Sequence, residues 1–158
     1  MPIVEIIQAR FPEQLEIVRD IFREYAHNLG VDLCFQNFES ELESLPGKYA
    51  APFGCVLLAW SEGQALGCVA LRSAGGSAGE MKRRYVRPQR RGLGLGAQLA
   101  TAICARAKTV GYQKICLDTL PSMKAALHIY AAMGFQSIPA YVFNPVEGAM
   151  YLGLDLTR

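Results

Sequence analysis

One segment, Tyr85–Ala97, constrains the fold of this chain more than any other. A strand-like stretch ending at Val86 is joined to an apolar helical pattern by a turn that holds alternate glycines and several arginines. Alternate glycines let the backbone approach a ligand closely, and the first turn of a helix leaves amide N–H groups without intrahelical partners. Those donors and the helix dipole attract anions. The segment therefore predicts a strand–turn–helix unit that holds a pyrophosphate.

Positive charge is gathered around this turn rather than spread over the chain. The formal net charge is only +2, from 16 Lys and Arg against 14 Asp and Glu, which does not indicate nucleic-acid or membrane binding. A stretch without a single acid holds Lys82, Arg83, Arg84, Arg87, Arg90 and Arg91. It predicts a positive potential suited to a small polyanionic ligand, because arginine binds phosphate oxygens bidentately. A solvated basic face is the alternative interpretation of such a charge run.

Length and composition predict one compact domain over residues 1–158, since 51% of the residues are hydrophobic. The five cysteines are odd in number and widely spaced, which predicts buried free thiols. No Cys-x-x-Cys pair occurs and His27 lies far from His128, so no metal site is expected. The sequence shows no leader pattern and no apolar run of roughly twenty residues. We therefore expect a cytoplasmic protein.

The first part of the chain alternates from strand to helix and back to strand. Apolar spacing predicts a strand over 3–8, a helix over about 13–29 and a shorter helix around 38–45. Two apolar strands over 55–61 and 65–72 are separated by residues typical of a tight hairpin turn. This part predicts antiparallel strand pairing beneath a helical pair.

The next strand, over 80–87, leads into the glycine-rich turn. Its apolar residues Met81, Tyr85 and Val86 do not keep a single parity along the strand. Because side chains alternate between the two faces of a sheet, such a change of parity permits a bulge within the strand.

The remaining pattern predicts a helix over about 94–110, a strand over 114–118 and a helix capped by Ser122 that ends near Met133. Further strand candidates lie on either side of Asn144-Pro145, the last of them over 149–156. Hairpin-length connections between the middle strands favour a mixed sheet with helices on both faces over a uniformly parallel one.

Two common nucleotide-binding loops fit the turn poorly. The P-loop pattern Gly-x-x-x-x-Gly-Lys-Ser/Thr does not occur in the chain. The dinucleotide pattern Gly-x-Gly-x-x-Gly fails because Leu99 stands where the last glycine is needed after Gly94 and Gly96. Asp118 follows at about the distance of the ribose-binding acid, roughly twenty residues on, and keeps a dinucleotide-binding alternative open.

The acyl-CoA loop fits, and here the chain resembles the GNAT superfamily of N-acetyltransferases. Residues 89–94, Gln-Arg-Arg-Gly-Leu-Gly, match that family's Gln/Arg-x-x-Gly-x-Gly/Ala signature between a strand and a helix. Residues 114–119, 125–130 and 133–135 are similar to its second motif, a strand, a helix and a closing Gly-Phe. The resemblance covers roughly residues 55–156, and the two motifs together are far more specific than either alone.

The resemblance implies a mixed, mostly antiparallel α/β sheet with helices on both faces and a splay between the fourth and fifth strands. The pantetheine arm of acetyl-CoA would lie in this splay like an added strand. The Val86 N–H would then polarise the thioester carbonyl. The cofactor-binding residues that the resemblance implies are Tyr85, Val86, Arg87, Arg91, Gly92, Gly94, Gly96, Ala97 and Thr119.

The resemblance also implies that Tyr130 is the general acid. A phenol with an ordinary pKa of about 10 can donate a proton to a thiolate whose thiol has a pKa of about 8.5. Glu80 is the candidate general base for the amine, because it begins the strand that leads to the cofactor loop. The alternatives are a core tyrosine at 130 and a surface salt bridge from Glu80 to Lys82 or Arg83. Arg84 departs from the family pattern, which places an apolar residue there.

The function implied is an acetyl-CoA-dependent N-acetyltransferase that moves an acetyl group to a primary amine of a small molecule or peptide, by direct transfer in a ternary complex and without a metal. Alternatives are a non-catalytic acyl-CoA-binding or regulatory module, acyl transfer through Cys116, and dinucleotide binding. We expect the acceptor surface to include the first helical pair and residues 48–53 and 138–143, with Tyr49, Tyr141 and Phe143 among its walls. Exposed edges of the last strands would allow a homodimer.

Overall fold

A computed structural model of the protein describes residues 3–30, 32–33 and 37–158. Within this part of the chain, a seven-stranded sheet has the order β1-β2-β3-β4-β5-β7-β6. Neighbouring strands pair antiparallel, except for the parallel pair β4 and β5. The strands are β1 Glu5–Gln8, β2 Cys55–Ser61, β3 Gln64–Gly75, β4 Ala78–Val86, β5 Lys114–Thr119, β6 Gln136–Ser137 and β7 Met150–Asp155. The predicted mixed, mostly antiparallel sheet is confirmed.

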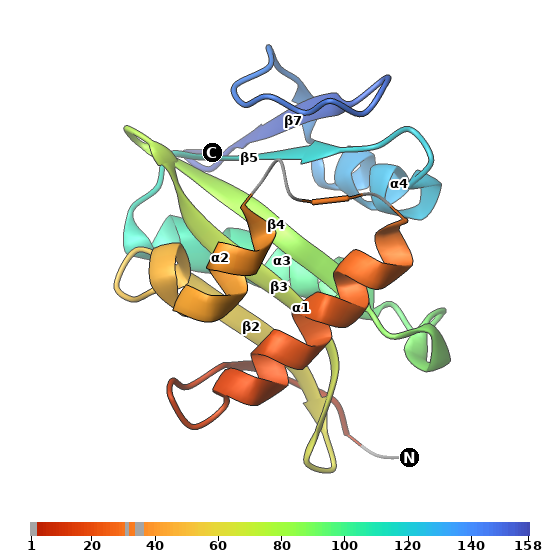
Figure 1. Ribbon diagram of the computed structural model, residues 1–158. Helices are drawn as coiled ribbons and strands as arrows, with labels where there is room; N and C mark the ends of the chain where they lie inside the picture. Colours follow the sequence, from red (N-terminus) through yellow and green to blue (C-terminus); the bar gives the residue numbers. More distant parts are fainter. Residues whose placement is uncertain (1–2, 31, 34–36) are drawn as a thin grey trace.

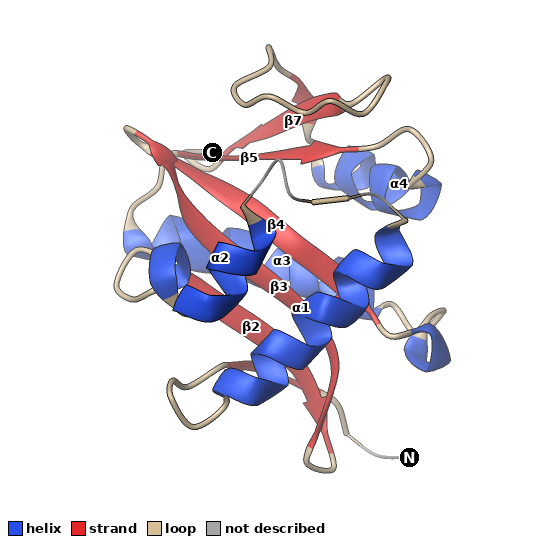
Figure 2. Cartoon of the chain, viewed as in Figure 1, coloured by secondary structure: helices blue, strands red, loops and turns tan. Residues whose placement is uncertain are grey.

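Helices cover both faces of this sheet, as Figures 1 and 2 show. The first pair lies on one face, and the second pair lies on the opposite face. Each pair packs its apolar stripe on the sheet, so that two hydrophobic cores form, one on each side. The α-helices are α1 Leu15–Leu29 and α2 Phe38–Ser44 on the first face, and α3 Leu95–Val110 and α4 Lys124–Met133 on the second.

Of the strands predicted around Asn144-Pro145, the last is confirmed as β7, whereas a strand directly beside Asn144-Pro145 is wrong, because residues 138–149 form the loop between β6 and β7. The side chain of Asn144 accepts a hydrogen bond from the Val146 N–H at 3.0 Å, and a turn of this kind competes with strand pairing. Ser122 does not cap the helix that follows it. Helix α4 begins later, and its N-cap residue Met123 makes no side-chain capping bond.

The fourth and fifth strands separate soon after they meet. Their parallel register has only three pairs, of which Glu80 with Cys116 is the last, and both strands continue beyond that point. This is the splay that the family resemblance implied. It opens a gap in the middle of the sheet, and parts of strands that flank such a gap keep backbone groups available for another partner.

A bulge lies in β4 beside the splay, as the change of parity predicted. The pairing with β3 shifts between the Cys68 and Ala70 positions, and Arg83 has a left-handed φ of 59°. Lys82 and Arg83 consequently both face the α1 and α2 side, whereas Arg84 faces the α3 and α4 side. The bulge thus brings an arginine to the face that α3 and α4 cover.

Gly67 on β3 allows the bulged strand to lie close. A Cβ at this position would sit 2.7 Å from the backbone oxygen of Tyr85 and 3.1 Å from Leu99 Cδ1. We expect Gly67→Ala to lower the free energy of unfolding by about 1–3 kcal/mol, because the backbone has to move. Chemical denaturation measures this loss. Gly153→Ala is the control, since its Cβ would meet mainly the Ile138 side chain at 3.0 Å, and an equal loss in both variants would contradict the explanation.

Candidate active site

A groove of about 730 Å³ lies where β4 and β5 separate. The end of β4, the turn at 90–94 and the first turn of α3 form one side of it. Residues 122–126, which reach into the first turn of α4, also line the groove, as do Tyr25, Asn28 and Leu29 of α1. A space of this size falls within the range of small-molecule and cofactor sites. The groove therefore joins the two sequence motifs, which are separated along the chain.

The glycine-rich turn presents backbone donors to this groove. Gly92 and Gly94 have left-handed φ values of 85° and 77°, which favour glycine at both positions. The helix α3 begins directly after Gly94, and the Gln98 N–H is bonded to the Gly94 oxygen at 3.1 Å. The preceding N–H groups of the first helical turn therefore have no acceptor within the helix. Five predicted cofactor-binding residues meet at this wall: Arg91, Gly92, Gly94, Gly96 and Ala97.

The backbone of β4 offers fewer groups to a ligand than expected. The Arg87 N–H donates to the Leu66 oxygen at 2.9 Å, and the Arg87 oxygen accepts from the Arg90 N–H at 2.9 Å. Because backbone groups alternate between the two sides of a strand, those of Val86 point away from β3 and toward the splay. Of the three residues expected to pair with a cofactor, Val86 is thus the one whose backbone groups point toward the splay, and its oxygen accepts from Arg91 Nε at 3.0 Å.

The side chain of Tyr85 ties α1 to the groove. Its hydroxyl donates to Glu24 at 2.7 Å and accepts from Asn28 Nδ2 at 2.8 Å. Burial, together with Glu24, raises the pKa of Tyr85 to about 12. The Arg91 guanidinium lies 5.7 Å from the centre of its ring. The first helical pair was expected at the acceptor surface, and α1 of that pair does contribute to this wall.

A small inner pocket of about 60 Å³ continues from the groove into the splay. Arg84 lines both spaces and stands at their junction. Thr119 lines the inner pocket rather than the groove in which it was expected. The polar side chains of this pocket include Lys82, Arg84, Asp118, Thr119, Tyr130 and Asn144.

Tyr130 reaches the inner pocket from α4. Its side chain is buried, and its ring packs against Phe135 with centroids 5.4 Å apart. The hydroxyl oxygen accepts a hydrogen bond from Arg84 Nε at 2.9 Å. A hydroxyl has a single proton, so an oxygen that accepts from Arg84 keeps its own proton for another partner. The predicted acid thus lies in the pocket with a proton available.

Glu80 does not face the cleft. Its carboxylate is 2% exposed, accepts from Arg72 Nε at 2.9 Å and from the Tyr141 hydroxyl at 2.8 Å, and lines neither the groove nor the inner pocket. Lys82 Nζ lies 4.0 Å from it and 3.8 Å from Asp118. The alternative prediction, a salt bridge from Glu80 at the surface, is not confirmed either, because the ion pairs of Glu80 are buried. Direct contact between Glu80 and an amine in the pocket is not supported by this arrangement.

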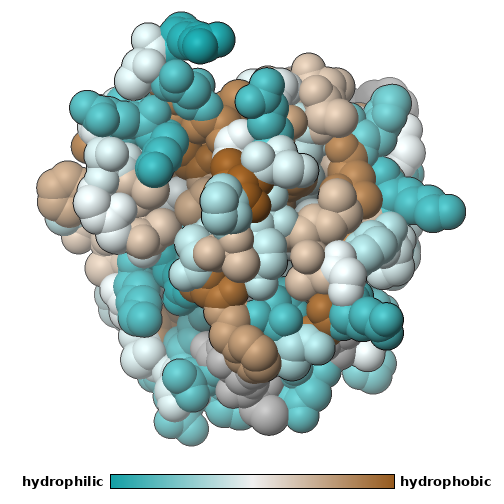
Figure 3. Space-filling model, turned by 90° about the horizontal axis from the view of Figure 1, so that it is seen from above, coloured by the Kyte–Doolittle hydropathy of each residue, from teal (hydrophilic) through white to brown (hydrophobic). Residues whose placement is uncertain are grey.

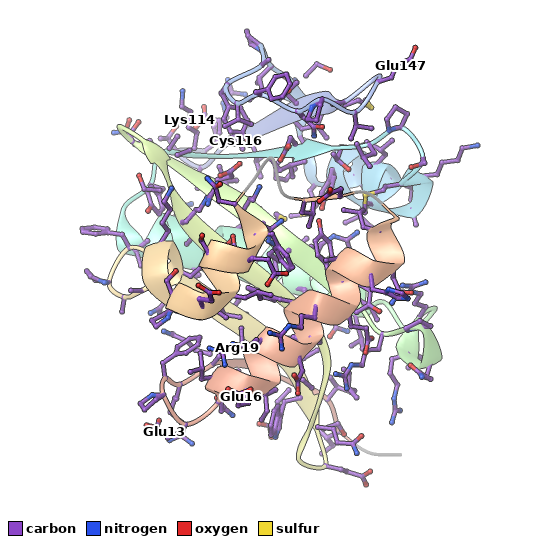
Figure 4. All side chains as sticks on the ribbon, in the orientation of Figure 1. Glu13, Glu16, Arg19, Lys114, Cys116 and Glu147 are labelled. Carbon is purple, nitrogen blue, oxygen red and sulfur yellow. The ribbon has the colours of Figure 1, made fainter. Side chains whose placement is uncertain are left out.

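Several other candidates of the sequence lie in the core. Tyr49 is buried, and its hydroxyl donates to Glu41 at 2.9 Å, so it is not a pocket wall. Cys116 lies on β5 near Lys114, as Figure 4 shows. Burial raises the pKa of its thiol, which disfavours it as an acyl carrier. The described cysteines are free and buried as predicted, whereas Cys34 lies outside the described residues.

The loop between β6 and β7 has a mixed surface. Phe143 in this loop is 77% exposed. Viewed from above, the molecule carries hydrophobic side chains in separate patches among hydrophilic ones (Figure 3). A contribution of residues 138–143 to the acceptor surface stays a prediction, although Tyr141 does contact Glu80 at one end of this segment.

Metal and membrane features were searched over the described ranges. In this part of the chain, no three His, Cys, Asp or Glu side chains gather in a way that could hold a metal ion. Among the helices described, none is both long and apolar enough to cross a membrane.

Comparison with known proteins gives a consistent family. Residues 15–135 match the acetyltransferase (GNAT) family. An uncharacterized N-acetyltransferase of Schizosaccharomyces pombe is 38% identical over 157 residues, which are 98% of this chain and 96% of that protein.

Solved structures share the fold. A GNAT acetyltransferase of Staphylococcus aureus superimposes with a TM-score of 0.80 at 18% identity, over 98% of this chain and all of that one. An acetyltransferase of Salmonella typhimurium, solved with acetyl-CoA, has a TM-score of 0.71 at 17% identity, covering 97% of this chain and 94% of its own.

Proposed function

Because the chain belongs to the acetyltransferase (GNAT) family, we propose that it transfers the acetyl group of acetyl-CoA to a primary amine of a small molecule or peptide. The observation that carries this proposal is that the groove and the inner pocket share lining residues, Arg84 among them, and so lie side by side. Backbone donors of the α3 N-terminus lie along the groove, and the Tyr130 hydroxyl lies in the pocket that follows it. The Salmonella relative of this fold was solved with acetyl-CoA, which supports the choice of cofactor.

The residues present fit an acyl-CoA at each part of the groove. Arg91 and the N–H groups of the first turn of α3 would hold the pyrophosphate. The Val86 N–H would hold the thioester carbonyl and stabilise its developing oxyanion. Acetyl-CoA would supply the activated acetyl group. The amine nitrogen forms the new C–N bond, the C–S bond breaks, and Tyr130 gives its proton to the sulfur and regains one from solvent.

The attacking amine must also lose a proton, and we propose that Lys82 receives it while Glu80 positions Lys82. Lys82 lines the inner pocket, and burial lowers the pKa of its ammonium group, although Glu80 and Asp118 oppose this shift. Glu80 lies next to Lys82 but does not line the pocket, and its carboxylate is held by Arg72 and Tyr141. In this arrangement Glu80 acts through Lys82 and not by direct contact with substrate.

Glu80→Gln is expected to move the acid limb of the kcat/KM profile to lower pH. Loss of the carboxylate removes a charge that favours the protonated form of Lys82, so its pKa falls further. A pH profile measured with the wild-type protein and the variant tests this. An unchanged profile with normal turnover would remove Glu80 from the mechanism.

The two other functional alternatives are less well supported. A non-catalytic acyl-CoA-binding module has no need for a tyrosine hydroxyl at the inner end of the groove. For dinucleotide binding, Asp118 would have to bind ribose, but its carboxylate accepts from Asn144 Nδ2 at 3.0 Å and lies near Lys82 in the inner pocket.

Release of coenzyme A during incubation of acetyl-CoA with a panel of small amines and peptides tests the activity. Turnover that needs both acetyl-CoA and an amine, with the acetylated amine identified by mass spectrometry, is the expected result. The variant carrying Arg91→Ala and Gly94→Trp, which obstructs the groove, is the control. Binding of acetyl-CoA without turnover on any amine would favour the non-catalytic module.

A further inference from the structure

We propose that Arg84 is a catalytic residue that stabilises the sulfur of coenzyme A as a thiolate while the C–S bond breaks, before Tyr130 protonates it. This inference rests on the proposed function. It starts from the position of Arg84, whose side chain lines both the cofactor groove and the inner pocket. Any ligand that extends from the α3 N-terminus to Tyr130 has to pass this side chain.

Among the described residues, the positive charge of Arg84 has no carboxylate partner, in contrast to several arginines of the same sheet region. Arg72 is paired with Glu80, Arg83 with Glu41, and Arg87 with Glu24. Throughout the described ranges, no carboxylate lies within 4.0 Å of the Arg84 guanidinium, whose Nε is bonded to a neutral hydroxyl. A half-buried cation of this kind favours an anion at the site.

The N-terminus of α3 makes the positive charge of Arg84 still less favourable in the absence of an anion. Gly96 belongs to the first turn of α3, and a Cβ at that position would collide with Arg84 Nη1. The guanidinium thus lies against the positive end of a helix dipole, where anions are favoured and cations are not. A negative group beside the guanidinium would be attracted both by its charge and by the helix N-terminus.

The anion that matches this place is the leaving thiolate. A hydrogen bond from Tyr130 to the sulfur places the sulfur next to an oxygen that is itself 2.9 Å from Arg84 Nε. The guanidinium then lies beside the atom that gains negative charge as the C–S bond breaks. The pyrophosphate and an acceptor carboxylate are the rival anions, and they predict different binding data.

The test uses the pH dependence of binding and needs no acceptor. Calorimetry gives the Kd of coenzyme A, acetyl-CoA and 3′-phospho-ADP at several pH values for the wild-type protein, Arg84→Met and Arg84→Lys. A free thiol has a pKa of about 8.5. If the bound thiol has a lower pKa, coenzyme A binds more tightly as the pH rises from below the bound pKa to above the free one. Acetyl-CoA has no such proton and serves as the reference.

For the wild-type protein we expect the affinity of coenzyme A relative to acetyl-CoA to rise about tenfold between about pH 6.5 and 9.5, which corresponds to a thiol pKa lowered by about one unit. Arg84→Met should reduce the rise to less than about twofold while it still binds acetyl-CoA. Arg84→Lys, which retains the positive charge, should keep most of the rise in relative affinity. This pattern would establish the thiolate site.

Three results would overturn the inference. The first is that wild-type protein binds acetyl-CoA, but its affinity for coenzyme A relative to acetyl-CoA does not change with pH. This result would leave the proposed function intact. The second is an equal rise in Arg84→Met. The third is that Arg84→Met binds acetyl-CoA and 3′-phospho-ADP more weakly by the same factor at every pH. That result would assign Arg84 to the pyrophosphate. Failure of wild-type protein to bind acetyl-CoA would overturn the proposed function together with the inference.

Discussion

Replacement of Tyr130 with Phe is expected to lower kcat by about 100-fold or more, the usual contribution of a positioned general acid. The Tyr130 hydroxyl lies in the inner pocket and accepts from Arg84, so the proton it retains can go to a leaving sulfur. The ring would remain in place, because its contact with Phe135 does not use the hydroxyl. We therefore expect the Kd of acetyl-CoA to change by less than about threefold.

Steady-state kinetics over a range of pH, with an amine found in the acceptor screen, measure this effect. Tyr112→Phe is a matched control, since the Tyr112 hydroxyl donates to the Phe53 oxygen at 2.8 Å and lines neither the groove nor the inner pocket. The control should keep wild-type turnover. If Tyr130→Phe also kept it at every pH, Tyr130 would have no part in the mechanism.

The second large effect concerns the ion pair between Arg83 and Glu41. Arg83 Nε lies 2.9 Å from Glu41 Oε2, Arg83 Nη2 lies 3.0 Å from Oε1, and the two side chains are 1% and 11% exposed. Burial disfavours the charge on Arg83, but the hydrogen bonds to Glu41 and its charge, together with Tyr49 and Tyr25, outweigh burial and raise the pKa of Arg83. The pair joins the bulge of β4 to α2.

Glu41→Ala should lower the free energy of unfolding by about 3–5 kcal/mol, because it leaves a buried guanidinium without its carboxylate. Replacing both partners, with Arg83→Met and Glu41→Leu, should recover most of the loss. Midpoints of chemical denaturation at unchanged slope give these values.

Glu16→Ala is the matched control for this loss. Glu16 and Arg19 lie on the same helix, α1 (Figure 4), and form an ion pair. Because Glu16 is 71% exposed, its removal should cost less than about 1 kcal/mol. A loss of this small size in Glu41→Ala would show that the buried pair does not hold the bulge to α2.

The order of helices and strands followed from the sequence because it depends on short-range patterns. Apolar periodicity located the helices around Phe22 and Leu99, and the change of parity between Met81 and Tyr85 located the bulge. The glycines of the turn lie in the groove wall as expected, since the left-handed φ of Gly92 is a local property of the chain.

The sequence did not show the partners of charged side chains, because these are set by tertiary packing. Glu80 was assigned to a cleft, yet its carboxylate is held by Arg72 and by Tyr141, which lies 61 residues further along the chain. Arg84 stood out as a departure from the family pattern, but its bond to Tyr130 joins β4 to a helix 46 residues away. No periodicity in the sequence encodes either contact.

Calorimetric titration of the protein with acetyl-CoA, free coenzyme A and NAD tests the central claim most directly. The proposal predicts a Kd on the order of micromolar for acetyl-CoA, loss of that binding in the variant carrying Arg91→Ala and Gly94→Trp, and no binding of NAD. Absence of acetyl-CoA and coenzyme A binding in the folded wild-type protein would contradict the assignment of the groove. Binding of NAD alone would assign the groove to a dinucleotide instead.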